Sequence, residues 1–479
     1  MYLGLDLGTS GLKGLVIDAG GAVVAEASAP LSVARPHPGW SEQDPADWIA
    51  AGEAVLRALA GKIDMAAIAG IGLSGQMHGA TVLDASDTVL RPSILWNDTR
   101  SHAQAARLDA DPRFRAVSGN IVFPGFTAPK LVWMEEEEPD LFARAAKVLL
   151  PKDYLRLWLT GDHVAEMSDA AGTSWLDVGA RDWSDDLLAA THLSRDHMPA
   201  LVEGSAPSGG LRAALASDFG LTPGIPVAGG AGDNAATAIG LGVARGGQGF
   251  VSLGTSGVLF AATDGYAPAP ETAVHTFCHA LPGTWHQMGV ILAATDALNW
   301  FSHLAGASPA ALTAHLGALQ APGRTLFLPY LGGERTPLNN ASIRGAFLGL
   351  EHATDRDAAT RAVLEGVVFA LKDCQDALAA TGTRIDTLIA AGGGARSDYW
   401  LSALATVLDL PILLPEAGDF GAALGAARLG LMAATGASTE AMPLPPIARE
   451  IAPVGTMTPA FNDTHARYRA AQTALKDLT

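Results

Sequence analysis

A strand–turn–strand pattern at the start of the chain occurs again far downstream, and this repeat constrains the fold more than any other feature. Leucines alternate with other residues over positions 1–7, which predicts a strand, and G-T-S-G at 8–11 predicts a tight turn into a second strand. The same four letters stand at 254–257, 246 positions further on, between two apolar runs. A unit repeated at this interval predicts two lobes of related build. Two ordinary glycine hairpins are the alternative interpretation.

The glycines of these turns also suggest a ligand. A turn with two glycines lets backbone N–H groups approach a phosphate closely, and such turns bind anions. Asp6 lies at the end of the first predicted strand, directly before the turn. A carboxylate in this place can hold Mg²⁺, which prefers oxygen ligands and phosphate partners. The pattern therefore predicts two phosphate loops, with Asp6 beside a metal ion.

Composition excludes several classes of partner. The 479 residues are enough for two or three domains, and 31 Lys+Arg against 49 Asp+Glu give a formal net charge of −18. An acidic chain without a basic run is a poor nucleic-acid binder. Two cysteines fit a reducing cytoplasm, Asp6 interrupts any secretory signal, and no run of about 18 apolar residues predicts a membrane span.

The first hundred residues predict the opening of an α/β domain. Strands over the first ~28 residues form an antiparallel meander, a helix runs from Pro45 to about Ala60 with Asp44 as its cap, and a strand follows at 67–74. This order is typical of a ribonuclease-H-like domain. Residues 438–458 are Pro-rich and are expected to be irregular, and a last amphipathic helix is expected at 461–478.

A glycine pattern and two polar clusters follow in this part of the chain. G-x-G-x-x-G at 70–75 makes dinucleotide binding a function to consider. The residues after it, however, do not predict the helix that this fingerprint must open. The clusters Q-M-H-G at 76–79 and L-W-N-D-T-R at 95–100 come just after apolar strands, so both are candidates to line a binding site. A satisfied loop histidine at His78 and a core aromatic at Trp96 are the alternatives.

Two further stretches carry candidate chemistry. At 225–236 an apolar strand ends in glycines before Asp233, which is a candidate general base or a plain helix cap. At 388–397 another strand runs into three glycines and a helix, which fits nucleotide binding. His275, Cys278, His279 and His286 imitate a metal site, but strand geometry would turn Cys278 and His279 in opposite directions.

Taken in order, these stretches resemble the FGGY carbohydrate kinases of the actin, Hsp70 and hexokinase superfamily. The motifs that carry the resemblance are D-L-G-T-S-G at 6–11, G-Q-M-H-G at 75–79, I-L-W-N-D at 94–98, G-D-N-A-A at 232–236, S-L-G-T-S-G at 252–257, G-E-R-T-P at 333–337 and G-G-G-A-R-S at 392–397. The resemblance implies an α/β fold of two ribonuclease-H-like lobes around an ATP and sugar cleft. It implies an N-terminal lobe at 1–245 and a C-terminal lobe at 246–479.

The resemblance is greatest to members that act on xylulose, and it implies ATP-dependent phosphorylation of D-xylulose to D-xylulose 5-phosphate with Mg²⁺. Asp233 matches the catalytic base, and Asp6 matches the acid near the metal and the γ-phosphate. The residues implied for the sugar are Met77, His78, Trp96, Asp98 and Asn234. The residues implied for ATP are Gly8, Thr9, Ser10, Gly11, Lys13, Gly254, Thr255, Ser256, Gly393, Gly394 and Ser397.

Other assignments stay open at this point. A kinase for another pentulose or a polyol would share the fold and differ in the sugar. A non-kinase ATPase such as a chaperone or filament protein would share the phosphate loops, but it would not need Q-M-H-G or W-N-D. The expected partners are a small sugar and ATP, without nucleic acid or membrane, and a homodimer is left open.

Overall fold

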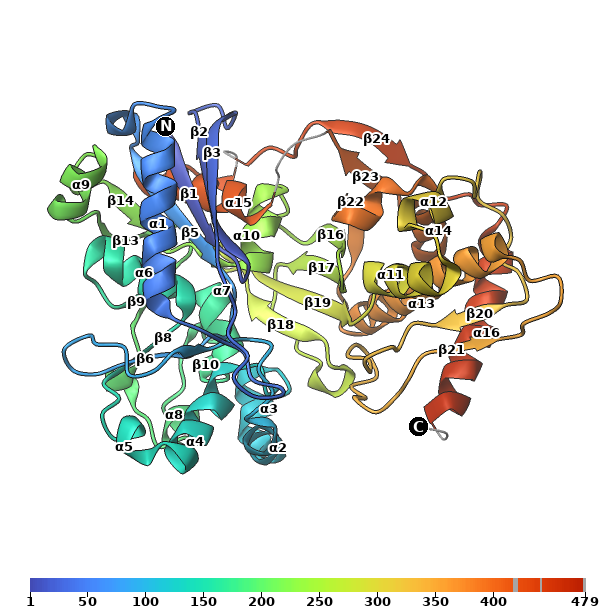
Figure 1. The fold of residues 1–479 in the computed structure, drawn as a ribbon, viewed down its shortest axis with the longest axis horizontal. Coiled ribbons are helices and arrows are strands. Elements are labelled where there is room, and N and C mark those ends of the chain that lie inside the picture. Colours follow the sequence, from blue (N-terminus) through green and yellow to red (C-terminus); the bar gives the residue numbers. More distant parts are fainter. Residues whose placement is uncertain (417–420, 440–441, 477–479) are drawn as a thin grey trace.

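The protein consists of two α/β halves, each built on one large sheet (Figure 1). The computed structural model describes residues 1–416, 421–439 and 442–476. Within these residues both large sheets have seven strands. The first sheet has the order β13-β14-β5-β1-β2-β3, with β15 also paired to β5. Its strands are β1 (Tyr2–Leu7), β2 (Gly11–Ile17), β3 (Val23–Pro30), β5 (Gly70–Gly75), β13 (Pro207–Gly210), β14 (Pro226–Ala228) and β15 (Ala231–Gly232).

The predicted antiparallel meander and the first helix are both confirmed. β1 pairs antiparallel with β2 and β2 with β3, while β1 and β5 run parallel. α1 (Pro45–Ala60) begins after Asp44, whose side chain accepts a hydrogen bond from the Ala46 N–H. The predicted strand at 67–74 begins later, at Gly70, because residues 65–67 form a 3₁₀ turn. The G-x-G-x-x-G pattern at 70–75 is therefore a strand and opens no helix.

The first sheet is covered by a helix from the far end of the chain. α15 (Ala422–Thr435) packs against β1, β5 and α10 (Asp233–Gly240), and Figure 1 shows this red-orange helix among the blue strands. A Cβ atom at Gly72 would overlap the carbonyl oxygen of Ala426, and one at Gly4 would overlap backbone atoms of α15. The glycines of β1 and β5 are thus explained by close helix packing, which leaves both faces of the strands buried.

The second sheet repeats the plan of the first in the C-terminal half. Its order is β18-β19-β17-β16-β22-β23-β24, and α13 packs against β19. The expected irregular segment at 438–458 is wrong in part, because β24 forms there and pairs antiparallel with β23. The elements are β16 (Gly247–Leu253), β17 (Gly257–Thr263), β18 (His275–Cys278), β19 (Trp285–Ile291), β22 (Ile385–Ala391), β23 (Ile412–Pro415), β24 (Ile447–Ile451), α11 (Thr295–Ala305), α12 (Pro309–Thr313), α13 (Arg356–Ala380), α14 (Asp398–Leu408) and α16 (Thr458–Lys476).

Smaller elements complete both halves. The expected last helix is α16, which begins three residues earlier than predicted, and the predicted residues 477 and 478 lie outside the described part. No helix in the described residues is both long and apolar enough to span a bilayer. The remaining elements are β4 (Glu42–Gln43), β6 (Thr81–Leu83), β7 (Ser93–Ile94), β8 (Lys147–Leu149), β9 (Val164–Glu166), β10 (Leu176–Asp177), β11 (Asp182–Trp183), β12 (Ala200–Val202), β20 (Leu326–Leu328), β21 (Ala346–Leu348), α2 (His102–Ala110), α3 (Pro112–Ser118), α4 (Thr127–Glu137), α5 (Pro139–Phe142), α6 (Pro151–Thr160), α7 (Met167–Ala170), α8 (Asp185–Ala189) and α9 (Ala213–Phe219).

Candidate active site

The strand register brings Asp6 and Asp233 to the same edge of the first sheet. β1, β5 and β15 run parallel, and Asp6 pairs with Ser74, which in turn pairs with Ala231. One step further, Leu7, Gly75 and Gly232 form the next row. All three strands therefore end together. The first glycine turn follows β1, Gln76 follows β5, and Asp233 follows β15. Ligands of α/β sheets bind beyond the carboxyl ends of parallel strands, so this edge is the candidate site.

The first glycine turn is held in shape by side chains from two other loops. The Gly8 N–H donates to the Gly11 carbonyl at 3.0 Å. The Thr9 hydroxyl donates to Gln76 Oε1 at 2.9 Å and accepts from Trp96 Nε1 at 3.0 Å. Trp96 keeps 48% of its surface exposed, so the alternative of a core aromatic is wrong. The indole is bound to the turn, and its predicted contact with sugar stays a prediction.

Lys13 lies directly across from Asp6 in the β1–β2 ladder. Its ammonium group also forms an ion pair of 2.9 Å with Glu26 on β3. The charge of Lys13 is thus positioned beside the strand that carries Asp6, and its predicted contact with ATP stays a prediction.

Asp233 is the first residue of α10 and has a restrained carboxylate. Gly232, and not Asp233, is the N-cap, so the plain capping interpretation is wrong. Asp233 Oδ1 accepts from the Asn234 N–H at 2.6 Å and from Asn234 Nδ2 at 2.9 Å. Burial raises the pKa of the Asp233 carboxyl, while both hydrogen bonds from Asn234 act in the opposite direction. A carboxylate whose pKa is raised in this way is suited to accept a proton.

Met77 lies against Gly232, the residue before Asp233, and His78 follows Met77 in the chain. A Cβ atom at Gly232 would come within 2.9 Å of Met77 Cγ, so the two chain segments are in contact. His78 Nδ1 lies 2.8 Å from the Gly172 carbonyl, which can only accept; Nδ1 therefore carries the proton and Nε2 is an acceptor. Burial lowers the pKa of His78 to about 3, so the ring is neutral. Among the described residues, only Nδ1 of His78 has a hydrogen-bond partner. The alternative of a fully satisfied loop histidine therefore holds for one of the two ring nitrogens.

Asp98 is also near these loops, but both of its oxygens are used within the protein. Oδ1 accepts from Arg100 Nε at 2.9 Å, and Oδ2 accepts from Arg100 Nη2 at 2.7 Å and from the Ser41 N–H at 2.6 Å. The side chain is fully buried, and the Arg100 guanidinium lies 3.6 Å from the centre of the Trp40 ring. Asp98 therefore holds the loop at 95–100 in place. Its predicted contact with sugar stays a prediction.

The second glycine turn joins β16 to β17 and is fastened to α11. The Ala294 N–H donates to the Thr255 carbonyl and the Thr295 N–H to the Gly254 carbonyl, both at 2.8 Å. Thr255 and Ser256 are exposed. Gly392, at a φ of +86°, packs so closely that a Cβ atom there would lie 2.7 Å from the Leu253 carbonyl oxygen. The third glycine loop is therefore adjacent to the second.

A cavity of about 810 Å³ opens beside these two loops in the C-terminal half. Its volume is within the range of small-molecule sites. The predicted nucleotide residues Gly393, Gly394 and Ser397 form one wall. Sequence reasoning missed the opposite wall, because α11 and α12 carry no motif there. That wall includes Thr295, Leu298, Asn299, Pro309, Ala310, Thr313 and Ala314.

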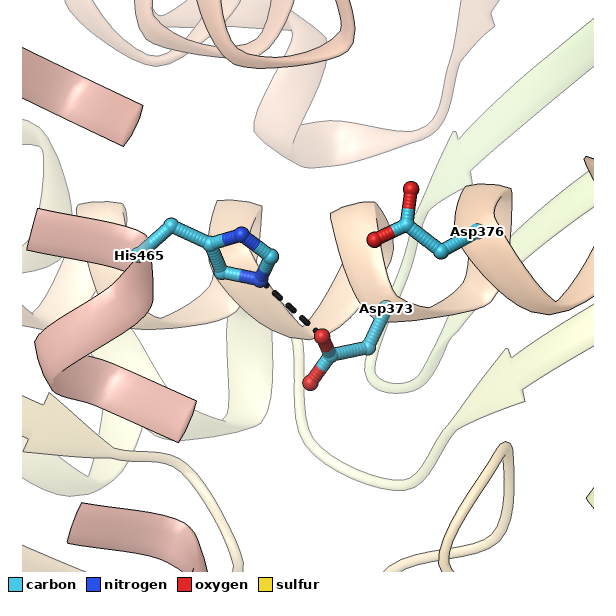
Figure 2. Close-up of side chains that lie close together, drawn as sticks. All are labelled: Asp373, Asp376 and His465. Atoms are coloured by element: carbon cyan, nitrogen blue, oxygen red, sulfur yellow. Dashed lines mark hydrogen bonds and ion pairs between the residues drawn. The ribbon is translucent and has the colours of Figure 1, made fainter. Parts of the chain in front are cut away.

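Two groups imitate metal sites, and within each group some of the side chains are engaged with other protein atoms. Cys278 Sγ donates to the Val178 carbonyl, whereas His279 Nε2 lies 3.2 Å from the Val243 carbonyl. The ligand atoms of Asp373, Asp376 and His465 lie within 4.8 Å of one another, and Figure 2 shows His465 reaching from α16 toward the two acids of α13. These acids already pair with His465 Nε2 at 2.9 Å, with Lys372 and with Arg469. This second group joins α16 to α13.

Comparison with known proteins identifies the family. Residues 1–240 match the model of the N-terminal domain of the FGGY family of carbohydrate kinases, and residues 249–434 match the model of its C-terminal domain. The chain belongs to this family and is a carbohydrate kinase. A kinase of this kind uses ATP and a divalent metal ion. The two α/β halves confirm the predicted fold class.

Relatives and solved structures with closely related descriptions are similar to nearly the whole chain. The chain is 49% identical over 437 residues to the xylulose kinase of Escherichia coli (strain K12), covering 91% of this chain and 90% of that protein. A crystal structure described as a xyloylose kinase from Brucella ovis is 62% identical with a TM-score of 0.98, covering 100% of both chains. The xylulose kinase of Rhodospirillum rubrum is 29% identical with a TM-score of 0.93, covering 100% of this chain and 99% of that one.

Proposed function

We propose that this chain transfers the γ-phosphoryl group of ATP to D-xylulose and releases D-xylulose 5-phosphate. The observation that carries the proposal is the row of neighbouring strand ends, after which come the first glycine turn, the segment with Met77 and His78, and Asp233. Relatives called xylulose kinase, aligned over about nine-tenths of the chain, support the choice of sugar.

In this proposal Asp233 is the general base. Its carboxylate accepts the proton of the attacking sugar hydroxyl, and Asn234 holds one of its oxygens. His78 Nε2 accepts a hydrogen bond from another hydroxyl, and Met77 supplies an adaptable apolar wall. Phosphoryl transfer asks a protein mainly for positioning and charge stabilisation, and these residues supply the positioning.

The glycine loops and Asp6 serve the nucleotide. Backbone N–H groups at 8–11 and 254–257 would hold phosphate oxygens, and the cavity beside Gly393, Gly394 and Ser397 would hold the adenosine. Asp6, at a strand end beside the first turn, would hold Mg²⁺, which supplies charge neutralisation on the phosphates when bound. Lobes at 1–245 and 246–479 that close around both substrates would exclude water. A cytoplasmic location and a homodimer stay predictions.

A coupled assay of ADP release tests the proposal. D-Xylulose, D-ribulose and glycerol are compared at matched concentrations, and phosphorus NMR identifies the phosphorylated position of the product. We expect the highest kcat/KM for D-xylulose and phosphate on O5. A higher kcat/KM for D-ribulose or glycerol would overturn the xylulose assignment and favour the kinase for another pentulose or polyol.

A further inference from the structure

Three basic side chains surround one aromatic cluster near the candidate sugar site. The cluster consists of Phe123, Phe126 and Phe277. His78 stacks on Phe126 with 4.5 Å between ring centres, and the His275 ring lies 5.4 Å from that of Phe123. The Arg335 guanidinium carbon lies 4.7 Å from the centre of the Phe123 ring. We call His78, His275 and Arg335 the basic cluster.

Two members of the basic cluster come from the C-terminal half. His275 is the first residue of β18, and Arg335 lies in the connection between β20 and β21. The residues on either side of Arg335 bind backbone groups in β19 and at Leu292, the residue that follows β19. Glu334 Oε1 accepts from the Leu292 N–H at 2.9 Å, and the Thr336 N–H donates to the Val290 carbonyl at 3.0 Å. Arg335 is therefore presented by a rigid piece of backbone.

Apart from His78 Nδ1, the side-chain nitrogens of the basic cluster have no hydrogen-bond partner in the part of the chain that the structure describes. Within residues 1–416, 421–439 and 442–476, the Arg335 guanidinium, the His275 ring and His78 Nε2 take part in no hydrogen bond or ion pair, although His275 is only 4% exposed. Glu334 precedes Arg335, and its Oε1 accepts hydrogen bonds from two backbone N–H groups. The Glu334 carboxylate forms no ion pair with the Arg335 guanidinium. Unlike the nitrogens of His286, these atoms are not sealed from solvent. His275 is buried and polar groups of buried residues are rarely left unpaired, while its nitrogens, His78 Nε2 and the side-chain nitrogens of Arg335 can still be reached from solvent, so their arrangement suits a polar ligand.

We propose that His275 and Arg335 bind the keto sugar together with His78, so that both halves of the chain build the sugar site. This inference rests on the proposed function. Arg335 offers N–H donors to the carbonyl or a hydroxyl oxygen of the sugar, and a neutral imidazole at His275 offers one donor and one acceptor. Burial and the nearby Arg335 hold the pKa of His275 well below its usual value, which keeps this ring neutral. The phenylalanine faces would contact the C–H groups of the sugar.

Variants of the two residues test the assignment. In Arg335→Lys, Arg335→Met and His275→Gln we expect the KM for D-xylulose to rise at least about tenfold, the size of one lost charge-assisted or buried hydrogen bond. The KM for ATP should stay within about twofold. Titration calorimetry of sugar alone should show the same loss of affinity. Arg344→Met is the control, because Arg344 follows in the same connection and its side chain donates to the carbonyls of Ala341 and Ile343.

A second measurement uses the wild-type protein. Phenylglyoxal modifies accessible arginines, and peptide mass spectrometry reports each position. We expect D-xylulose to protect Arg335 and to leave Arg344 unprotected. The inference is overturned if the folded variants keep the wild-type sugar KM, or if sugar leaves the modification rate of Arg335 unchanged. If the wild type prefers another sugar, the proposed function fails, and the same measurements with that sugar decide the role of Arg335 and His275.

Discussion

Gly72 and Ala426 are packed so closely that a Cβ atom on Gly72 would overlap the carbonyl oxygen of Ala426. The first residue lies in β5 near the start of the chain, and the second lies in α15 near its end. The contact holds a helix of the C-terminal segment against the sheet that carries Asp6 and precedes Asp233 (Figure 1). Folding of the candidate site therefore requires both ends of the chain.

Gly72→Ala should destabilise the protein. The added methyl group forces α15 away from β5, and overpacking of this kind costs about 1–3 kcal/mol, occasionally more. Thermal unfolding should show a lower midpoint than wild type. Gly265→Ala is the matched control, because no atom lies within 4 Å of a Cβ atom there. Equal midpoints for the two variants would contradict the packing argument.

Gly172→Ala should weaken sugar binding more than folding. Its Cβ atom would overlap the His78 ring and would lie 3.0 Å from Met77 Cε, so both proposed sugar residues must move. We expect the KM for D-xylulose to rise about tenfold or more, as for one lost buried hydrogen bond, with the KM for ATP nearly unchanged. Steady-state kinetics with each substrate varied in turn measures this. Gly455→Ala, in open space, should behave as wild type.

Asp233→Asn should lose about 10²- to 10⁴-fold in kcat, because the amide keeps the shape of the side chain but accepts no proton. Nucleotide affinity should be retained. Burial raises the pKa of Asp233, so wild-type kcat/KM should fall as the pH drops through a pKa above that of an ordinary aspartate. Turnover of the variant near the wild-type rate would exclude Asp233 as the base.

Ala314→Trp should obstruct the nucleotide cavity. Ala314 lines the 810 Å³ space, and a large side chain there would occupy part of it. We expect a higher KM for ATP and a weaker binding of ADP in calorimetry, with the affinity for sugar unchanged. Ala311→Trp is the control, because Ala311 is exposed in α12, the helix that ends directly before Ala314, and is not among the residues that line the cavity. An unchanged ADP affinity in Ala314→Trp would place the adenosine elsewhere.

Glu334→Gln should reduce the pH dependence of stability. Burial raises the pKa of Glu334 from 4.5 to about 8, so between these values the folded state keeps a proton that the unfolded state releases. The free energy of unfolding of the wild type should therefore fall as the pH rises through this window, by up to about 1.4 kcal/mol per pH unit from this group. Urea unfolding from pH 5 to 9 measures the slope. The exposed Glu450→Gln should leave the slope unchanged.

Local patterns in the sequence determined the elements that frame the site. The leucine alternation before G-T-S-G, the Asp44–Pro45 helix start and the glycines before Asp233 each act within a few residues, so their strands, turns and helix starts could be predicted. The same patterns singled out Asp233 and His78 as candidates before their neighbours were known. The roles of these residues stay proposals.

Only the tertiary structure decided which distant segments meet. Four features depend on contacts between segments far apart in the chain or on side-chain orientation. They are the ion pair that holds Asp98 to Arg100, the cavity wall from α11 and α12, the strand β24, and the position of His275 and Arg335 beside His78. Periodicity shows which face of a segment is apolar but not which partner covers it. The partner is selected by packing and register, as when the glycines of β5 admit α15 and so define the sheet edge that carries the site.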